Sequence, residues 1–145
     1  MTVLFSKKCE LGLQAILYLS TLELSTGKSS GEISEKLDIP KEFVSKVLQL
    51  LTKSGLVGSK KGKQGGFYLA KPANEIRLFD IVKSIDGTKL FETCVLGFPG
   101  CTTSKPCPVH NIWGKIRDDT YNMLNEQTLE ELRDLTKEKI ACFNI

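Results

Sequence analysis

One sequence feature constrains the fold more than any other: the spacing of apolar residues changes from a helical period to a strand period near Gly55. Before this glycine, two short helical patterns begin at Ser30 and at about Pro40, and the second continues up to the glycine. After it, two short strand patterns cover residues 56–59 and 67–70. Two short helices joined by a tight turn and followed by a β-hairpin predict a winged helix-turn-helix.

The remaining apolar spacing predicts helices on both sides of this motif. One amphipathic pattern covers residues 11–22 and precedes the motif, and another covers residues 78–85 and follows it. Two more helices are expected at residues 111–124 and from Thr128 onward. We therefore predict a mainly α protein whose β-structure is a small hairpin, the wing.

Positive charge is concentrated in the predicted motif. Residues 41–71 contain seven lysines against the single carboxylate of Glu42, whereas residues 1–40 and 72–145 are each slightly negative. A basic stretch on a helix-turn-helix favours binding to the phosphates of duplex DNA. We therefore expect a DNA-binding protein. The alternative is a winged-helix interaction module, whose lysines only solvate a surface that contacts other proteins.

The second helix of a helix-turn-helix enters the major groove, so its exposed residues are candidates for base contacts. Lysine and glutamine both have base partners there, and lysines of a wing suit phosphate or minor-groove contacts. The DNA-binding candidates are Lys41, Glu42, Ser45, Lys46 and Gln49 on the helix, and Lys60, Lys61, Lys63 and Gln64 on the wing.

A second cluster of reactive residues lies in a loop that is rich in proline. Cys94, Cys101, Cys107 and His110 have the spacing C-x6-C-x5-C-x2-H, and His110 is the only histidine of the chain. Thiolates and imidazole are metal ligands, so this spacing predicts a metal site. Residue chemistry alone leaves zinc, an iron–sulfur cluster and a reactive thiol set open. A thiol-redox enzyme is a weaker alternative, because no substrate-positioning or oxyanion motif accompanies the loop.

With these motifs in view, the chain resembles the Rrf2-type transcriptional regulators, a family that includes IscR and NsrR. The resemblance extends over nearly the whole sequence, and a cysteine triad beside a wing of this kind is a specific combination. The segments that carry it are residues 5–8, 12–19, 39–48, 55–57 and 62–70, the three cysteines, and residues 110–113.

The resemblance implies a homodimer, built on the long helix after the cysteine loop, and an iron–sulfur cluster held by the three cysteines. In IscR-like members a histidine matching His110 completes a 2Fe–2S site. In NsrR-like members an acidic residue of the partner subunit, matching Glu10, completes a 4Fe–4S site. The resemblance also implies a DNA operator as partner. We expect a repressor whose operator affinity responds to redox state, nitric oxide or iron supply.

The expected organisation has three parts. A winged helix-turn-helix domain covers residues 1–86, a cluster-binding loop covers 87–110, and a dimerisation helix with a C-terminal helix covers 111–145. Two features depart from the family pattern: the first cysteine interval is one residue longer, and Ser45 replaces a glutamate of IscR-like members. No targeting segment and no apolar stretch of ~20 residues is visible, so we expect a cytoplasmic protein without membrane contact.

Overall fold

Six α-helices and one two-stranded antiparallel sheet make up the computed structural model, which describes residues 4–23, 26–63 and 65–144. The helices are α1 (Lys7–Ser20), α2 (Ser30–Leu37), α3 (Lys41–Lys53), α4 (Leu78–Ile85), α5 (His110–Glu126) and α6 (Leu129–Ala141). The strands are β1 (Val57–Lys60) and β2 (Gly66–Leu69), and 3-10 turns lie at Ala73–Glu75, Lys89–Phe91 and Cys142–Asn144. The predicted fold class is confirmed.

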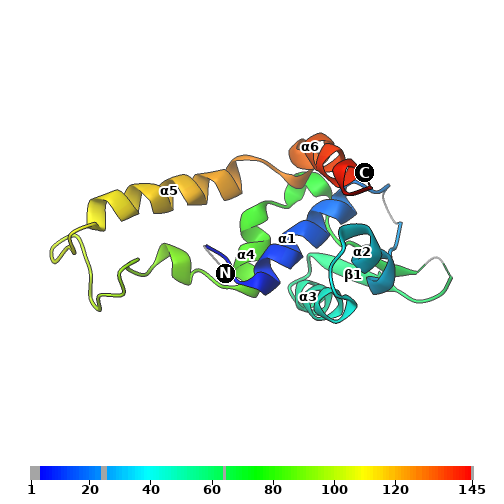
Figure 1. The fold of residues 1–145 in the computed structure, drawn as a ribbon, viewed down its shortest axis with the longest axis horizontal. Helices are drawn as coiled ribbons and strands as arrows, with labels where there is room; N and C mark the ends of the chain where they lie inside the picture. The colour runs from blue at the N-terminus through cyan, green and yellow to red at the C-terminus, as the bar shows by residue number, and fades with distance from the viewer. Residues whose placement is uncertain (1–3, 24–25, 64, 145) are drawn as a thin grey trace.

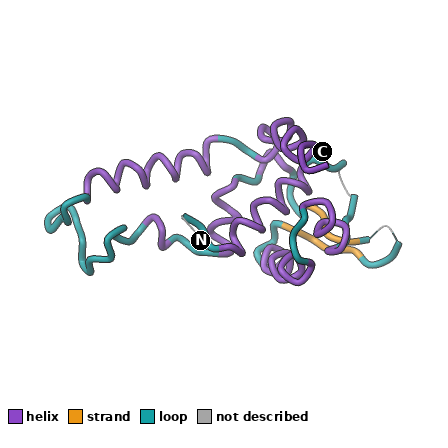
Figure 2. The backbone as a smooth tube through the Cα atoms, viewed as in Figure 1, coloured by secondary structure: helices purple, strands orange, loops and turns teal. Residues whose placement is uncertain are grey.

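The molecule has two regions, which Figure 1 and Figure 2 show side by side. The body consists of α1 to α4, the sheet and α6. The arm consists of residues 89–126, namely the second 3-10 turn, the cysteine loop and α5. The cysteine loop lies at the end of the arm that is farthest from the body.

The helix-turn-helix is fixed by a helix cap and by one left-handed residue. α2 begins with a capping box, in which the Ser29 hydroxyl accepts from the Glu32 amide and the Glu32 carboxylate accepts from the Ser29 amide. Asp38 ends α2 at φ 55°, and Pro40 stands directly before α3. Because aspartate tolerates the left-handed region better than most residues, the turn forms at the predicted break.

α3 packs against α1 and α2 through its apolar side. Its buried residues are Val44, Val47, Leu48 and Leu51, and all four belong to the main core. Burial of one such side chain contributes about 1.5–3 kcal/mol. This packing fixes the rotation of α3 about its axis and therefore decides which residues it presents to solvent.

The wing is joined to the body by a backbone pairing. Lys28, in the connection between α1 and α2, forms an isolated bridge with Phe67 of β2. The Lys28 N–H donates to the Phe67 carbonyl at 2.9 Å, and the Phe67 N–H donates to the Lys28 carbonyl at 2.7 Å. Gly66 has φ +127°, and a Cβ atom there would lie 2.4 Å from the Lys28 carbonyl carbon. Glycine is therefore required at this crossing.

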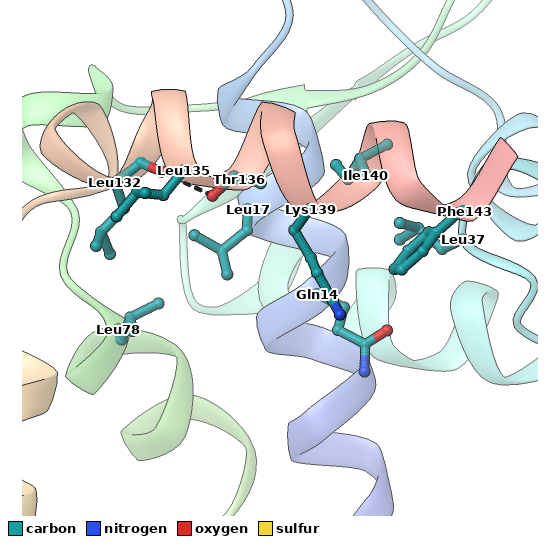
Figure 3. A pocket seen from close by; sticks show the side chains of 10 residues that line it. All are labelled: Gln14, Leu17, Leu37, Leu78, Leu132, Leu135, Thr136, Lys139, Ile140 and Phe143. Carbon is teal, nitrogen blue, oxygen red and sulfur yellow. Dashed lines mark hydrogen bonds between the residues drawn. The ribbon is translucent and has the colours of Figure 1, made fainter. Parts of the chain in front are cut away.

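α6 returns to the body and packs on α1, as the close view in Figure 3 shows. Leu129 and Ile140 of α6 are buried, and the Arg133 Nε–H donates to the Ser20 carbonyl at 2.7 Å. An apolar groove of about 260 Å³ lies along this contact. The C-terminal helix thus belongs to the body, although it follows the arm in sequence.

Three aromatic rings join the arm to the body. Phe79 of α4, Phe91 of the 3-10 turn and Tyr121 of α5 pack edge to face, with ring centroids 5.0 to 5.6 Å apart. The Arg77 guanidinium donates to the Asn125 carbonyl near the end of α5 at 3.1 Å. The base of the arm is therefore anchored to α4.

The structure differs from the sequence-based expectation mainly at the ends of elements. α1 begins at Lys7 rather than at residue 11, because the Ser6 hydroxyl caps it by accepting from the Cys9 amide at 3.1 Å. Each strand is displaced by one residue, and α5 begins one residue earlier and ends two residues later than predicted. None of the described helices is both long and apolar enough to cross a membrane.

Candidate DNA-binding surface and metal site

α3 presents its five candidate residues on the side away from the core. Lys41, Glu42, Lys46 and Gln49 are exposed, and Ser45 is half-buried. This arrangement follows from the helical period, which separates them from the buried apolar residues of the same helix. The predicted recognition surface is therefore available to a large partner.

The wing presents its lysines at the last residue of β1 and in the turn that follows. Lys60, Lys61 and Lys63 are exposed, and the Lys60 Nζ lies 5.1 Å from the centroid of the Tyr68 ring. Gly58 is the register partner of Tyr68, and a Cβ atom at Gly58 would lie 2.6 Å from that ring. Glycine at position 58 therefore leaves room for this ring beside Lys60. Gln64, the remaining wing candidate, lies outside the described residues.

The lysines of this surface form no ion pairs within the described residues. Within residues 4–23, 26–63 and 65–144, the one ion pair joins the Lys28 ammonium to Glu32 at 3.5 Å. The described lysines of α3 and the wing carry no such partner, so their positive charge faces solvent. Unpaired lysines gathered on one surface raise the local potential and attract anions such as DNA phosphates.

The three predicted cysteine ligands converge in the arm. The Sγ atoms of Cys94, Cys101 and Cys107 all lie within 4.8 Å of one another, and those of Cys94 and Cys107 are 3.5 Å apart. All three are partly buried free thiols. The chain between the first two changes direction at Gly97 and Gly100, whose φ angles are +81° and +66°.

His110 extends this group to four donors. It is the first residue of α5, and its Nδ1 atom lies 3.2 Å from the Cys101 Sγ. Its backbone N–H donates to the Cys107 carbonyl at 3.1 Å, so the last cysteine and the histidine share one tight turn. Three thiols and one imidazole at this range suit a soft metal ion or an iron–sulfur cluster.

Comparison with known proteins identifies the family. Residues 5–134 match the family model Rrf2, described as an iron-dependent transcriptional regulator. The chain belongs to the Rrf2 family. The resemblance found in the sequence is thereby confirmed.

Two relatives show how this Rrf2 chain compares with characterised regulators. The HTH-type transcriptional regulator IscR of Pectobacterium carotovorum is 34% identical over 70% of this chain and 61% of its own length. The HTH-type transcriptional regulator NsrR of Oceanobacillus iheyensis is 32% identical over 79% of this chain and 78% of its own length. Such relatives are regulators and not enzymes, so this Rrf2 chain is a transcriptional regulator.

Solved structures support the fold of the Rrf2 chain. IscR of T. potens has a TM-score of 0.70 and 26% identity, and the match covers 93% of this chain and 88% of that one. CymR, the global cysteine regulator of B. subtilis, has a TM-score of 0.77 and 23% identity, with coverages of 92% and 98%. The arrangement of body and arm is thus shared with known Rrf2-type structures.

The thiols of the Rrf2 cysteine site differ in acidity. Partial burial acts to raise the pKa of Cys94, but hydrogen bonds from the backbone of Phe98 and Leu96 and from the neighbouring thiols outweigh it and hold the pKa at about 7. The pKa of Cys107 is raised, chiefly by partial burial. Cys94 is therefore the thiol of this pair that ionises first, and the thiolate is the form that binds metal.

Glu10, the other predicted ligand, does not join the cysteine site within one described chain. It lies in the first turn of α1, in the body, beside Cys9. Cys9 is fully buried, and its burial, reinforced by the charge of Asp86, raises its pKa to about 12. Ligation by Glu10 therefore requires a second copy of the chain. Cys142, at the other end of the chain, is exposed and also lies outside the site.

Two residues that position these sites were missed in the sequence. The Trp113 Nε1–H donates to the Thr93 carbonyl at 3.0 Å, which ties α5 to the residue before the first cysteine. Lys28 was not a candidate either, although its backbone anchors the wing. No local pattern signals either contact, because each joins residues that are far apart in sequence.

Proposed function

We propose that this Rrf2 regulator binds duplex DNA as a homodimer in the cytoplasm and acts there as a repressor. The chemical state of its cysteine site sets its affinity for the operator. The observation that carries this proposal is the convergence of three thiols and an imidazole at the start of α5. The iron-dependent description of the family supports iron as the metal.

DNA recognition is assigned to α3 and the wing. Lys46 and Gln49 have natural partners among base edges of the major groove, and the wing lysines suit backbone phosphates. Each lysine–phosphate contact releases a counterion, so binding should weaken steeply as salt rises. Replacing Lys60, Lys61 and Lys63 together by alanine should weaken binding to all DNA sequences and flatten that salt dependence.

The dimer is assigned to α5, whose outward side is apolar and uncovered. Ile112, Ile116 and Met123 are 66%, 48% and 55% exposed, whereas Leu124 is the buried residue of this helix. Apolar side chains gathered on one exposed surface mark a contact site, and a second α5 would cover them. In the proposed organisation, residues 1–86 bind DNA, 87–110 hold the cofactor, and 111–145 supply the dimerisation helix and the C-terminal helix.

The donor set fits an iron–sulfur cluster. Cys94, Cys101 and Cys107 would hold it, and the fourth ligand would be His110 for a 2Fe–2S cluster or Glu10 of the partner subunit for a 4Fe–4S cluster. When bound, the cluster supplies a centre that oxidants, nitric oxide and iron scarcity alter. The protein's own residues bring the thiols together at the start of α5, with Trp113 holding the loop against the helix.

The base of the arm connects this site to the DNA-binding surface. Tyr121 of α5 contacts Phe79, and Arg77 holds the end of α5, so α4 receives any change in the direction of the arm. α4 itself packs against α1 and α3. A coupling free energy of roughly 1–3 kcal/mol between the two sites is enough to change operator affinity by 5–150-fold.

Anaerobic purification tests the cofactor. We expect a coloured protein that contains iron and sulfide, and we expect joint replacement of Cys94, Cys101 and Cys107 by serine to remove both. Cys142→Ser is the matched control and should keep them, because Cys142 lies outside the cysteine site. Gel shifts of the loaded and cluster-free protein then test the gating. Failure of both forms to bind DNA at low ionic strength would contradict the proposal and favour a protein-interaction module.

The short distance between the Cys94 and Cys107 sulfurs favours a second candidate function, sensing without an iron–sulfur cluster. The site would then hold a single zinc ion or act as a reactive thiol pair. Two sulfurs on one tetrahedral zinc ion lie about 3.8 Å apart, and those of Cys94 and Cys107 are 3.5 Å apart. Alternatively, a peroxide can oxidise this pair: the two thiols lose two protons and two electrons and form a disulfide, while the peroxide is reduced to water. Stoichiometric zinc in a colourless protein, or peroxide-sensitive DNA binding without metal, would identify these cases.

A further inference from the structure

We infer that Lys8 and Lys53, together with Lys46, form a phosphate-binding hollow beside α3 that extends the DNA contact beyond the helix-turn-helix and the wing. The inference rests on the proposed DNA binding and adds Lys8 and Lys53 to it. The expected occupant is a phosphodiester group of the DNA backbone.

The hollow is formed by two helices. It is a cavity of about 210 Å³ lined by Lys8, Lys46, Gln49, Leu50 and Lys53. The four residues of α3 stand at positions i, i+3, i+4 and i+7 and therefore lie along one side of that helix. Lys8 completes the hollow from the first turn of α1, which packs against α3. All three lysines are exposed.

The chemistry of the lining points to an anion. The ammonium groups of Lys8 and Lys53 can donate hydrogen bonds into the hollow, the positive charge of Lys46 adds to theirs, and no carboxylate lines it. None of the three lysines forms an ion pair within the part of the chain that the structure describes. Like charges around one cavity repel one another, and an anion bound between them relieves this repulsion. A phosphodiester supplies one negative charge and two acceptor oxygens.

The place of the hollow favours DNA as the source of that phosphate. In Figure 1, α3 lies between the beginning of α1 and the hairpin. Lys8 belongs to the first turn of α1 and the wing lysines belong to the hairpin, so the hollow and the wing border α3 from different elements. The major groove is about 12 Å wide, so the two DNA backbones that border it pass on both sides of an inserted helix. The wing would meet one backbone and the hollow the other.

The salt dependence of DNA binding tests this inference. The probe is a short mixed-sequence duplex, titrated with full-length wild type, Lys8→Gln, Lys53→Gln and Lys7→Gln at a series of salt concentrations. Loss of one phosphate contact should flatten the slope of log K against log salt by about one. We expect this change for Lys8→Gln and for Lys53→Gln. Lys7→Gln, an equal charge change at the neighbouring exposed residue, should keep the wild-type slope.

The outcomes separate this inference from the proposed function. If the wild type binds DNA but Lys8→Gln keeps its slope, the hollow has no role and the DNA-binding proposal survives. Equal flattening by Lys7→Gln would also overturn the inference, because general charge would explain the effect. If the wild type binds no DNA, the proposed function itself fails.

A second probe distinguishes DNA from free anions. Inorganic phosphate is added, and the Tm of the wild type and of Lys8→Gln is measured. If phosphate raises the Tm of the wild type alone, and both proteins have the same salt dependence of DNA binding, then the hollow binds a free anion. That result would overturn the assignment to DNA. The Tm of each variant in the absence of phosphate serves as the folding control. It should not fall, because the lysines are exposed and repel one another.

Discussion

Cys9 in the body and Cys94 in the arm show how differently the two regions treat the same side chain. Cys9 is completely buried in an apolar cluster with Val82 and Leu124, and burial raises its pKa to about 12. Cys94 lies in an open loop where hydrogen bonds hold its pKa at about 7. In the body, the thiol of Cys9 packs like a small apolar side chain. In the arm, the thiols remain partly exposed and can react or bind metal.

The same contrast holds for apolar side chains. The main core of the body gathers buried residues from α1, α2, α3, α4 and α6, so the body has a shared apolar core. In the arm, apolar residues are exposed along both the loop and α5: Val95, Leu96, Phe98, Ile112, Ile116, Tyr121 and Met123. The arm therefore leaves apolar side chains exposed in a single chain, and the proposed dimer would cover those of α5.

The difference in acidity between Cys94 and Cys9 gives the largest expected effect. We expect it in the rates at which iodoacetamide alkylates the two thiols of the reduced, metal-free protein. At pH 7 about half of Cys94 is thiolate, against a fraction on the order of 10⁻⁵ for Cys9 at its pKa of about 12. Even after the greater reactivity of the more basic thiolate is allowed for, we expect Cys94 to react at least ~10² times faster. Mass spectrometry of peptides measures both rates.

The dependence on pH sharpens this test. The rate at Cys94 should rise with pH, pass half its maximum near the pKa of about 7, and level off roughly one pH unit higher, where the thiol is almost fully ionised. Cys142 provides an exposed reference thiol outside the cysteine site. Equal rates at Cys9 and Cys94 would mean that the body opens as readily as the arm.

Packing gives the next largest effect. Leu48→Ala in the body removes a fully buried side chain, and we expect a loss of about 2–5 kcal/mol in the free energy of unfolding. Ile112→Ala in the arm removes one that is 66% exposed and should change the stability of the monomer by less than about 0.5 kcal/mol. Urea unfolding at low protein concentration measures both.

Self-association should be affected in the opposite way, more by Ile112→Ala than by Leu48→Ala. Ile112→Ala should weaken self-association in sedimentation experiments, since Ile112 lies on the proposed dimer side of α5. Leu48→Ala should leave self-association unchanged under conditions where it is folded. An Ile112→Ala protein that dimerises like the wild type would remove α5 from the proposed interface.

The contrast between the regions also explains what could be predicted from the sequence. The helix-turn-helix follows from local signals, such as the helical pattern that begins at Ser30 and the second that begins at about Pro40. The convergence of the cysteines was predicted because their spacing is short and their chemistry is specific. The hollow at Lys8 was not predicted, because it depends on how two helices pack, and no spacing along one segment encodes that contact.

The junction of the wing and the body gives a smaller effect. In Gly66→Ala the new Cβ atom would lie 2.4 Å from the Lys28 backbone, so we expect the bridge to open, with a loss of about 1–3 kcal/mol and weaker DNA binding. Gly62→Ala is the matched control, because Gly62 also has a positive φ, +108°, but no atom within 4 Å of the added Cβ. Thermal unfolding and gel shifts that do not distinguish the two variants would show that the bridge to Lys28 does not hold the wing.

The smallest expected effect concerns the closure of the cysteine loop. Trp113→Phe keeps an aromatic ring but removes the N–H that donates to the Thr93 carbonyl, a bond worth about 0.5–1.5 kcal/mol. Because Thr93 directly precedes Cys94, we expect the variant to lose its bound metal or cluster faster to a chelator, with little change in unfolding of the body. Tyr121→Phe, which keeps its ring among the aromatic contacts at the base of the arm, should release metal at the wild-type rate. If both variants release metal at the same rate, the hydrogen bond from Trp113 does not stabilise the loop. The loop would then be held in place only by the bonds between its cysteines and the metal or cluster.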